Sequence, residues 1–127
     1  MKSDRAIALV PYIDDDAMNL HLMQRIFAKS PTIEIEIESD GRRGLDFIRE
    51  RMPDVVLLDL NLKTMSGESI LRDVREHAAT AEIPVVVVPG DVSDVTKQRL
   101  LVAGAQHFLE KPFSISDVVS LVTGLID

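Results

Sequence analysis

Short apolar runs alternate along this chain with segments in which apolar residues recur every three or four positions. The apolar runs cover residues 7–13, 55–58 and 85–88, residues 33–38 alternate isoleucine with glutamate, and residues 107–110 hold a short apolar pair, Phe108 and Leu109. Apolar runs of this length predict strands, and a spacing of three or four predicts amphipathic helices. Strands that alternate with helices are typical of β-α-β units around a parallel sheet. The pattern therefore predicts an α/β fold of five such units.

The predicted strands are of two kinds. Residues 55–58 and 85–88 are almost entirely β-branched or leucine, as in central parallel strands covered by helices on both faces. Residues 33–38 place isoleucines on one side and glutamates on the other, as expected for a half-solvated edge strand. Pro11 falls inside the first strand and has no N–H for a neighbouring strand. A bulge or an early end of that strand would absorb the loss of this N–H, but either would disturb the approach to Asp14 and Asp15.

Helices are expected after each strand. Asp16 is expected to cap a helix over residues 17–28, and Asp40 with Gly41 begins the next one. Ser114 followed by Asp117 opens the last helix. The apolar residues assigned to the inner faces of the helices are Leu20, Met23, Phe27, Leu45, Ile48, Ile70, Leu71, Val74, Val95, Leu100, Leu101, Ile115, Val118, Val119 and Val122.

Composition narrows the class of protein. The chain has 127 residues, of which 46% are hydrophobic and 28% charged, as expected for one globular domain over residues 1–127. No apolar run approaches the roughly 20 residues of a membrane span, and no apolar leader follows Met1, so a cytoplasmic location is expected. The absence of cysteine excludes disulfides and thiol catalysis. The net charge of -7 disfavours direct nucleic-acid binding and favours cations and basic protein surfaces.

Charged residues collect at the carboxyl ends of three predicted strands. Asp14, Asp15 and Asp16 follow the first strand, Asp59 ends the third, and Lys111 follows the last. Taken singly, each is most simply a loop acid, a helix cap or a surface lysine. Ligands of open parallel α/β sheets, however, bind at this edge, where the charges would meet.

The carboxylates of Asp14, Asp15 and Asp59 would form a cluster, and such a cluster stays ionised when a cation accompanies it. Mg²⁺ prefers oxygen ligands and readily adds a phosphate oxygen, and Mn²⁺ is a further candidate. A lysine in the cluster would offset charge on phosphoryl oxygens. The pattern therefore predicts cation-assisted transfer of phosphate onto Asp59.

Four stretches carry a resemblance to a known family: residues 12–16, 53–62, 65–67 and 110–113. Together they resemble the receiver domain of bacterial response regulators over essentially the whole chain. The separations between Asp15, Asp59 and Lys111 agree with that family as well. The resemblance implies a flavodoxin-like, doubly wound (βα)5 fold with a five-stranded parallel sheet in the order 2-1-3-4-5.

The resemblance also implies roles for single residues. Asp59 would be the phosphoacceptor, Asp14 and Asp15 the acidic pair that holds Mg²⁺, and Lys111 the contact to the phosphoryl group. Asn61 would offer its backbone carbonyl to the metal.

The resemblance also predicts a backbone feature at Pro112 and a role for Phe108. The bond between Lys111 and Pro112 would be cis. Phe108 would occupy the aromatic switch position, although a packing role is an equal alternative for this side chain.

The family's activity is signalling rather than enzymatic, apart from self-catalysed phosphotransfer and slow autodephosphorylation. A member takes phosphate from a histidine kinase or a histidine phosphotransfer protein. It then changes the face formed by its fourth helix, fifth strand and fifth helix, which binds a downstream protein.

Pro89 departs from the family pattern, which has threonine or serine at the end of the fourth strand. That hydroxyl couples the phosphoryl group to the aromatic switch, and proline has neither a hydroxyl nor an N–H. A hydrogen bond to a charged group contributes roughly 1.5–3 kcal/mol, so its loss would cut the phosphorylation-driven population shift by roughly ten- to a hundred-fold. Gly90 keeps an N–H that could meet the phosphate.

Three functions follow from these residues. The favoured one is a phosphoacceptor switch in a two-component pathway. Pro89 makes a receiver-like module that binds partners irrespective of phosphate a serious alternative. A hydrolase acting through an aspartyl phosphate needs a second carboxylate at the position of Asn61, and we set it aside.

Overall fold

The computed structural model describes residues 6–90 and 93–127, in which strands and helices alternate along the chain. The strands are β1 (Ala8–Ile13), β2 (Ile33–Glu38), β3 (Val56–Asp59), β4 (Val85–Val88) and β5 (His107–Phe108). The helices are α1 (Ala17–Ile26), α2 (Gly41–Arg51), α3 (Gly67–Glu76), α4 (Asp94–Ala103) and α5 (Ile115–Ile126).

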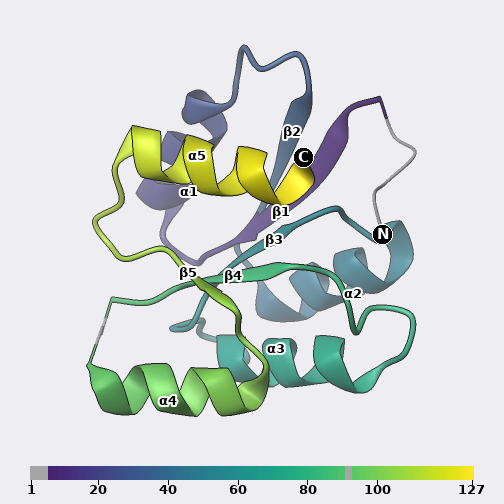
Figure 1. Ribbon diagram of the computed structural model, residues 1–127, viewed down its shortest axis with the longest axis vertical. Coiled ribbons are helices and arrows are strands. Elements are labelled where there is room, and N and C mark those ends of the chain that lie inside the picture. The colour runs from purple at the N-terminus through teal and green to yellow at the C-terminus, as the bar shows by residue number, and fades with distance from the viewer. Residues whose placement is uncertain (1–5, 91–92) are drawn as a thin grey trace.

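The strands form one parallel sheet in the order β2-β1-β3-β4-β5, and helices cover both of its faces (Figure 1). The predicted fold class and strand order are confirmed. Three predicted elements are shorter than expected: β1 begins at Ala8, α1 ends at Ile26, and β5 has only two residues. No helix within the described residues is long and apolar enough to cross a membrane.

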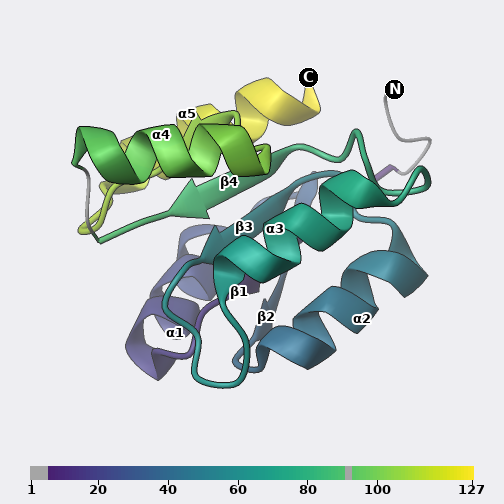
Figure 2. The same cartoon turned by 90° about the horizontal axis from the view of Figure 1, so that it is seen from below.

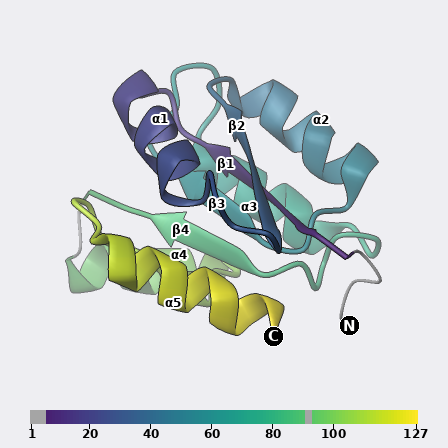
Figure 3. The ribbon, with the colours of Figure 1, turned by 90° about the horizontal axis from the view of Figure 1, so that it is seen from above.

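Strand side chains alternate between two apolar layers, one on each face of the sheet. Val10, Tyr12 and Leu57 belong to the layer under α1 and α5, which lie in front of the sheet in Figure 3. Ile13 and Leu58 belong to the layer under α2, α3 and α4; α3 and α4 lie in front in Figure 2. Residues two positions apart on one strand therefore share a layer.

β2 lies at one edge of the sheet and pairs with β1. Its sequence alternates isoleucine and glutamate; Ile33 is buried, Glu34 is exposed and the other four residues are half-buried. This burial agrees with the predicted half-solvated edge strand.

Pro11 lies in the middle of β1 without a bulge or an early end. The register between β1 and β2 is continuous, from Ala8 opposite Ile33 to Ile13 opposite Glu38. The strand therefore accommodates Pro11 with neither of the two distortions that the sequence raised.

Hydrogen-bond direction explains this tolerance. Successive residues of a strand direct their backbone groups to opposite neighbours. The Asp14 N–H donates to the Glu38 carbonyl of β2 at 3.1 Å, so Pro11, an odd number of positions away, faces β3 instead. The absent N–H affects only the ladder with β3, in which pairing begins at Tyr12.

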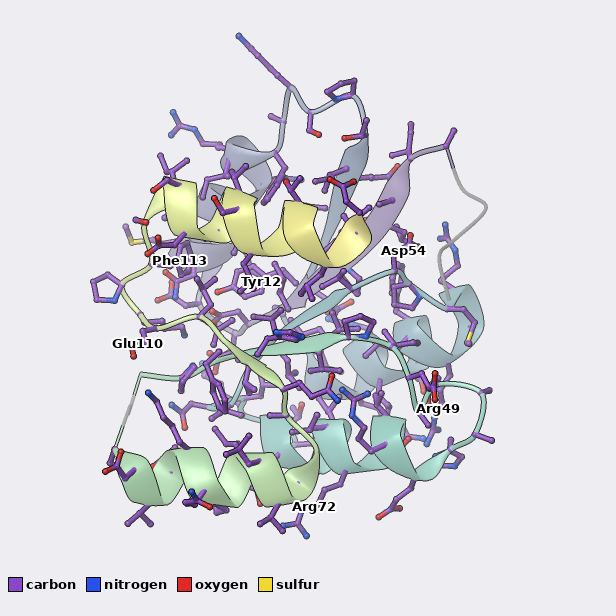
Figure 4. The ribbon with its side chains drawn as sticks, in the orientation of Figure 1. Tyr12, Arg49, Asp54, Arg72, Glu110 and Phe113 are labelled. Carbon is purple, nitrogen blue, oxygen red and sulfur yellow. The ribbon has the colours of Figure 1, made fainter. Side chains whose placement is uncertain are left out.

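A side chain anchors β1 on that side, before the proline. The Leu9 N–H donates to Asp54 Oδ2 at 2.8 Å, and the Asp54 N–H donates to the Leu9 carbonyl at 2.9 Å. Asp54 lies in the segment before β3 and is labelled in Figure 4. This bridge holds the start of β1 to β3 where the regular ladder is absent.

The predicted inner face of α4 is wrong at two positions. Val95 and Leu101 are 76% and 49% exposed, whereas Thr96, Leu100 and Ala103 are buried. The buried residues follow a helical spacing of four and three, so one narrow stripe with two small side chains contacts the sheet. α4 itself carries apolar residues on several sides, and packing against the sheet decides which of them are buried.

In α5, Val118 and Val122 are buried as predicted, but Ile115 is 62% exposed and Val119 is 37% exposed. The inner stripe of α5 is therefore also narrower than the sequence indicated.

Gly67 is expected to tolerate no side chain. A Cβ at this position would lie 2.2 Å from the Asp59 carbonyl oxygen and 2.8 Å from the Leu60 Cα. Because both are backbone atoms, β3 and α3 would have to separate, and we expect Gly67→Ala to lower the free energy of unfolding by about 1–3 kcal/mol. Urea denaturation measures this change.

Gly124, inside α5, is the matched control. A Cβ there meets no heavy atom of the described residues within 4 Å outside its own helix and chain neighbours. Gly124→Ala should raise the free energy of unfolding by about 0.5–1 kcal/mol, because alanine loses less backbone entropy in a helix. Equal effects of the two alanines would contradict the close approach at Gly67.

Candidate functional site

Asp14, Asp15 and Asp59 lie together at the carboxyl edge of the sheet. One carboxylate oxygen from each lies within 4.8 Å of the other two. Asp14 is fully buried and Asp59 is 2% exposed, whereas Asp15 is half-buried. Asp14 follows β1 and Asp59 ends β3, and these strands are neighbours in the sheet. The structure thus brings together the three acids that the sequence placed at this edge.

Lys111 links the two buried acids. Its Nζ lies 3.0 Å from Asp59 Oδ1 and 3.2 Å from Asp14 Oδ2. The Lys111 backbone N–H donates to the Pro89 carbonyl at 3.3 Å, which holds the segment after β5 against the end of β4. The peptide bond between Lys111 and Pro112 is cis, as the resemblance implied.

The charges of this cluster are unequal among the described residues. Three carboxylates lie together and one lysine contacts two of them, Asp14 and Asp59, which leaves a net negative charge in a largely buried site. A divalent cation would compensate it, and carboxylate oxygens are the ligands that hard cations prefer. The donor set therefore fits a metal ion, held by Asp14, Asp15 and Asp59.

Burial and neighbouring groups move the pKa values of the two buried acids in opposite directions. Burial raises the pKa of Asp59 above its ordinary value; the hydrogen bond from Lys111 opposes the rise and the charge of Asp14 adds to it. Burial would also raise the pKa of Asp14, but hydrogen bonds from Tyr12 and the Asp16 N–H, together with Lys111, hold it below its ordinary value. Asp59 is therefore the more easily neutralised acid.

The pKa of Lys111 is raised in turn. Burial alone would lower it, but the hydrogen bond and charge of Asp59, and those of Asp14, outweigh burial. Lys111 thus remains a cation between the two carboxylates.

Two residues that the sequence did not single out also contact the site. The Tyr12 hydroxyl donates to Asp14 Oδ2 at 2.5 Å, and Asn19 Nδ2 donates to the same oxygen at 3.3 Å. Tyr12 precedes Asp14 by two positions at the end of a strand, which places both side chains on one face. This spacing of two residues was the signal in the sequence that Tyr12 lies beside Asp14.

The remaining predicted site residues lie around the acids. The Asn61 backbone N–H helps to lower the pKa of Asp59, against the effect of burial, and Asn61 is exposed. Pro89 is buried and Gly90 is exposed. Phe108 is half-buried and packs against the layer under α2, α3 and α4. This position is compatible with packing, and the switch role of Phe108 stays a prediction.

Comparison with known proteins identifies the family. The family model of the response regulator receiver domain matches residues 10–123. The chain belongs to this family. Receiver domains are signalling domains of two-component systems, and phosphorylation of an aspartate is general among them.

Several curated proteins are similar to this receiver domain. The DNA-binding response regulator MtrA of Mycobacterium tuberculosis is 33% identical over 110 residues, 87% of this chain and 46% of MtrA. The response regulator ArlR of Staphylococcus saprophyticus is 26% identical over 90% of this chain and 50% of its own length. The sensor histidine kinase TmoS of Ectopseudomonas mendocina is 30% identical over 76% of this chain and 10% of the kinase. The chain thus spans half or less of these relatives.

Solved structures show the same fold. The chemotaxis protein CheY4 of Vibrio cholerae superposes with a TM-score of 0.87 at 24% identity, covering 94% of this chain and 99% of that one. The signal receiver domain of a DNA-binding response regulator from Colwellia psychrerythraea superposes with a TM-score of 0.85 at 26% identity, covering 94% of this chain and 98% of that one.

Replacing the Asp59 carboxylate should stabilise the metal-free protein. Because burial raises the pKa of Asp59, its ionisation lowers the free energy of unfolding as the pH rises above the unfolded-state pKa, about 3.9. We expect Asp59→Asn to unfold at higher urea than the parent at neutral pH in EDTA. The difference should shrink as the pH falls toward about 4.

Glu82→Gln changes an exposed carboxylate and serves as the control, which should show no such gain. An Asp59→Asn variant that is less stable than the parent at neutral pH would contradict the expected cost of ionised Asp59.

Proposed function

We propose that this receiver domain, a single unit over residues 1–127, accepts a phosphoryl group on Asp59. The donor would be the phosphohistidine of a histidine kinase or histidine phosphotransfer protein, and Mg²⁺ would occupy the acidic pocket. The observation that carries this proposal is the buried Asp59 carboxylate, clustered with Asp14 and Asp15 and 3.0 Å from Lys111 Nζ.

The proposed reaction is a single displacement at phosphorus. The bond between phosphorus and the donor nitrogen breaks, and an Asp59 oxygen forms the new bond, which gives an acyl phosphate. Catalysis of such transfers is mainly positioning and electrostatic stabilisation. Lys111 Nζ donates to the Asp59 carboxylate and holds it in place. Lys111, as a compact cation, would also attract the phosphoryl oxygens.

Asp14, Asp15 and Asp59 would hold the Mg²⁺, and the Asn61 carbonyl would be a further ligand. Mn²⁺ could use the same oxygens. When bound, the ion offsets the negative charge that gathers on the phosphoryl oxygens during transfer.

The downstream partner would bind the face of α4, β5 and α5. Exposed apolar side chains on both helices support this surface: Val95 and Val102 on α4 are 76% and 84% exposed, and Ile115 on α5 is 62% exposed. On this proposal the domain is a signalling element and not an enzyme acting on a separate substrate, and it loses its phosphoryl group only slowly.

Incubation with acetyl phosphate and Mg²⁺ tests the acceptor chemistry. We expect intact-mass analysis to show one added phosphoryl group on the parent and none on Asp59→Asn. Excess EDTA should reduce the labelled fraction strongly, because the acids would then lack their counter-charge. An added group that persists in Asp59→Asn would place the acceptor elsewhere, and an unlabelled parent would overturn the proposal.

A second function is favoured by one observation, the buried proline at position 89. Because Pro89 offers no hydroxyl to a phosphoryl group on Asp59, phosphorylation would have little means of shifting Phe108 through this position. The domain would then bind its partners irrespective of phosphate.

Restoring the hydroxyl distinguishes the two functions. Beryllofluoride with Mg²⁺ mimics the phosphoryl group, and amide NMR signals report how far its effect extends. We expect changes near Asp59 in the parent, and changes extending to Phe108 and α4 in Pro89→Thr, with a population shift roughly ten- to a hundred-fold larger.

Pro89→Ala is the matched control for that experiment, since it removes the proline ring without adding a hydroxyl. It should behave like the parent. Changes at Phe108 and α4 already present in the parent would show that switching does not need a hydroxyl at position 89.

A further inference from the structure

We infer that Tyr12 is a positioning residue of the acidic pocket, whose hydroxyl fixes the Asp14 carboxylate in the orientation from which it binds a metal ion. This inference rests on the proposed metal-dependent function and extends it to a residue inside the sheet.

Tyr12 contacts the site from within the core. Its side chain is fully buried in the layer under α1 and α5, and Figure 4 shows it between the sheet and α5. The hydroxyl donates to Asp14 Oδ2 at 2.5 Å, and Asp14 is itself fully buried. A charge-assisted bond of this length is among the stronger hydrogen bonds in proteins.

The two oxygens of Asp14 have unequal partners among the described residues. Oδ2 accepts from the Tyr12 hydroxyl and from Asn19 Nδ2, and it also faces Lys111 Nζ at 3.2 Å. Oδ1 accepts the Asp16 N–H at 2.9 Å. Since a carboxylate offers about four lone-pair sites, Oδ2 is saturated and Oδ1 keeps capacity for a metal ion. The Tyr12 bond therefore fixes which oxygen is available.

A packing role does not account for the hydroxyl. Several strand residues of this layer are purely apolar, among them Val10, Leu57, Val86 and Val88. Phenylalanine would fill the same space, and a buried hydroxyl lowers stability unless it is hydrogen-bonded. Its partner is a carboxylate of the metal-ligand cluster, so the hydroxyl acts on the site as an outer-shell group does on a ligand.

Metal affinity is the readout that separates positioning from packing. Mn²⁺ binding to the full chain is followed by loss of the free-ion electron paramagnetic resonance signal. Removing an outer-shell partner typically weakens metal binding about 10- to 100-fold, and we expect this range for Tyr12→Phe. Asn19→Ala removes the longer bond to the same oxygen and should weaken binding less. Urea unfolding in EDTA shows whether each variant is folded.

A folded Tyr12→Phe that binds Mn²⁺ as tightly as the parent would overturn the inference and leave the proposed function intact. Equal weakening by Asn19→Ala would overturn the assignment to the tyrosine hydroxyl. A parent that binds no Mn²⁺ would overturn the metal-dependent function itself, and the inference with it.

A second measurement applies should Tyr12→Phe fail to fold. The chain has a single tyrosine, so 3-fluorotyrosine places one ¹⁹F probe at Tyr12. Mg²⁺ should shift this signal in the labelled parent and leave it unchanged in labelled Asp59→Asn under the same conditions. No shift in the parent on addition of saturating Mg²⁺ would overturn the inference.

Discussion

The ion pairs of Lys111 with Asp14 and Asp59 are the interaction on which the site depends. Two buried carboxylates on adjacent strands repel each other, and in a low-dielectric interior that repulsion is weakly screened. The lysine offsets it at 3.2 and 3.0 Å, from a segment that the Pro89 carbonyl holds beside β4. Removing the lysine would leave two buried carboxylates without their shared cation, the costly case for buried ion pairs. Three strand ends are thus joined by charge as well as by backbone pairing.

In this arrangement, the residues that would bind a phosphoryl group are distinct from the residues that would pass its effect on to β5. The acids and the lysine lie together, with Asp14 held by the Asp16 N–H and Asp59 by Lys111 Nζ. Transmission would need a group that moves between the phosphate and β5, and Pro89 offers only a carbonyl, already bound to the Lys111 N–H. Lys111 remains as a connection, because its side chain contacts Asp59 and its backbone follows β5. A change at Asp59 would therefore reach β5 through Lys111.

The sequence predicted the parallel strands and the acid cluster because both follow from local patterns and one topological rule about strand ends, whereas the strand order came from the family resemblance. Predictions from the sequence failed where the burial or the contacts of a residue depend on a neighbour in space that no local pattern identifies. The effect of Pro11 depends on which adjacent strand its nitrogen faces. Val95 and Leu101 are exposed because packing selects one stripe of a helix that is apolar on several sides. Tyr12 passes for an ordinary apolar strand residue until Asp14 is placed beside it.

The edge strand β2 has a consequence for the behaviour of the protein in concentrated solution. An edge strand can pair with the same strand of another molecule and extend the sheet into an aggregate. Glu34, Glu36 and Glu38 would then bring like charges together across the new interface, within a chain whose net charge is -7. Protonation or high salt would weaken that repulsion. Colloidal stability of this protein should therefore depend on the charge of β2 and not on the burial of its isoleucines.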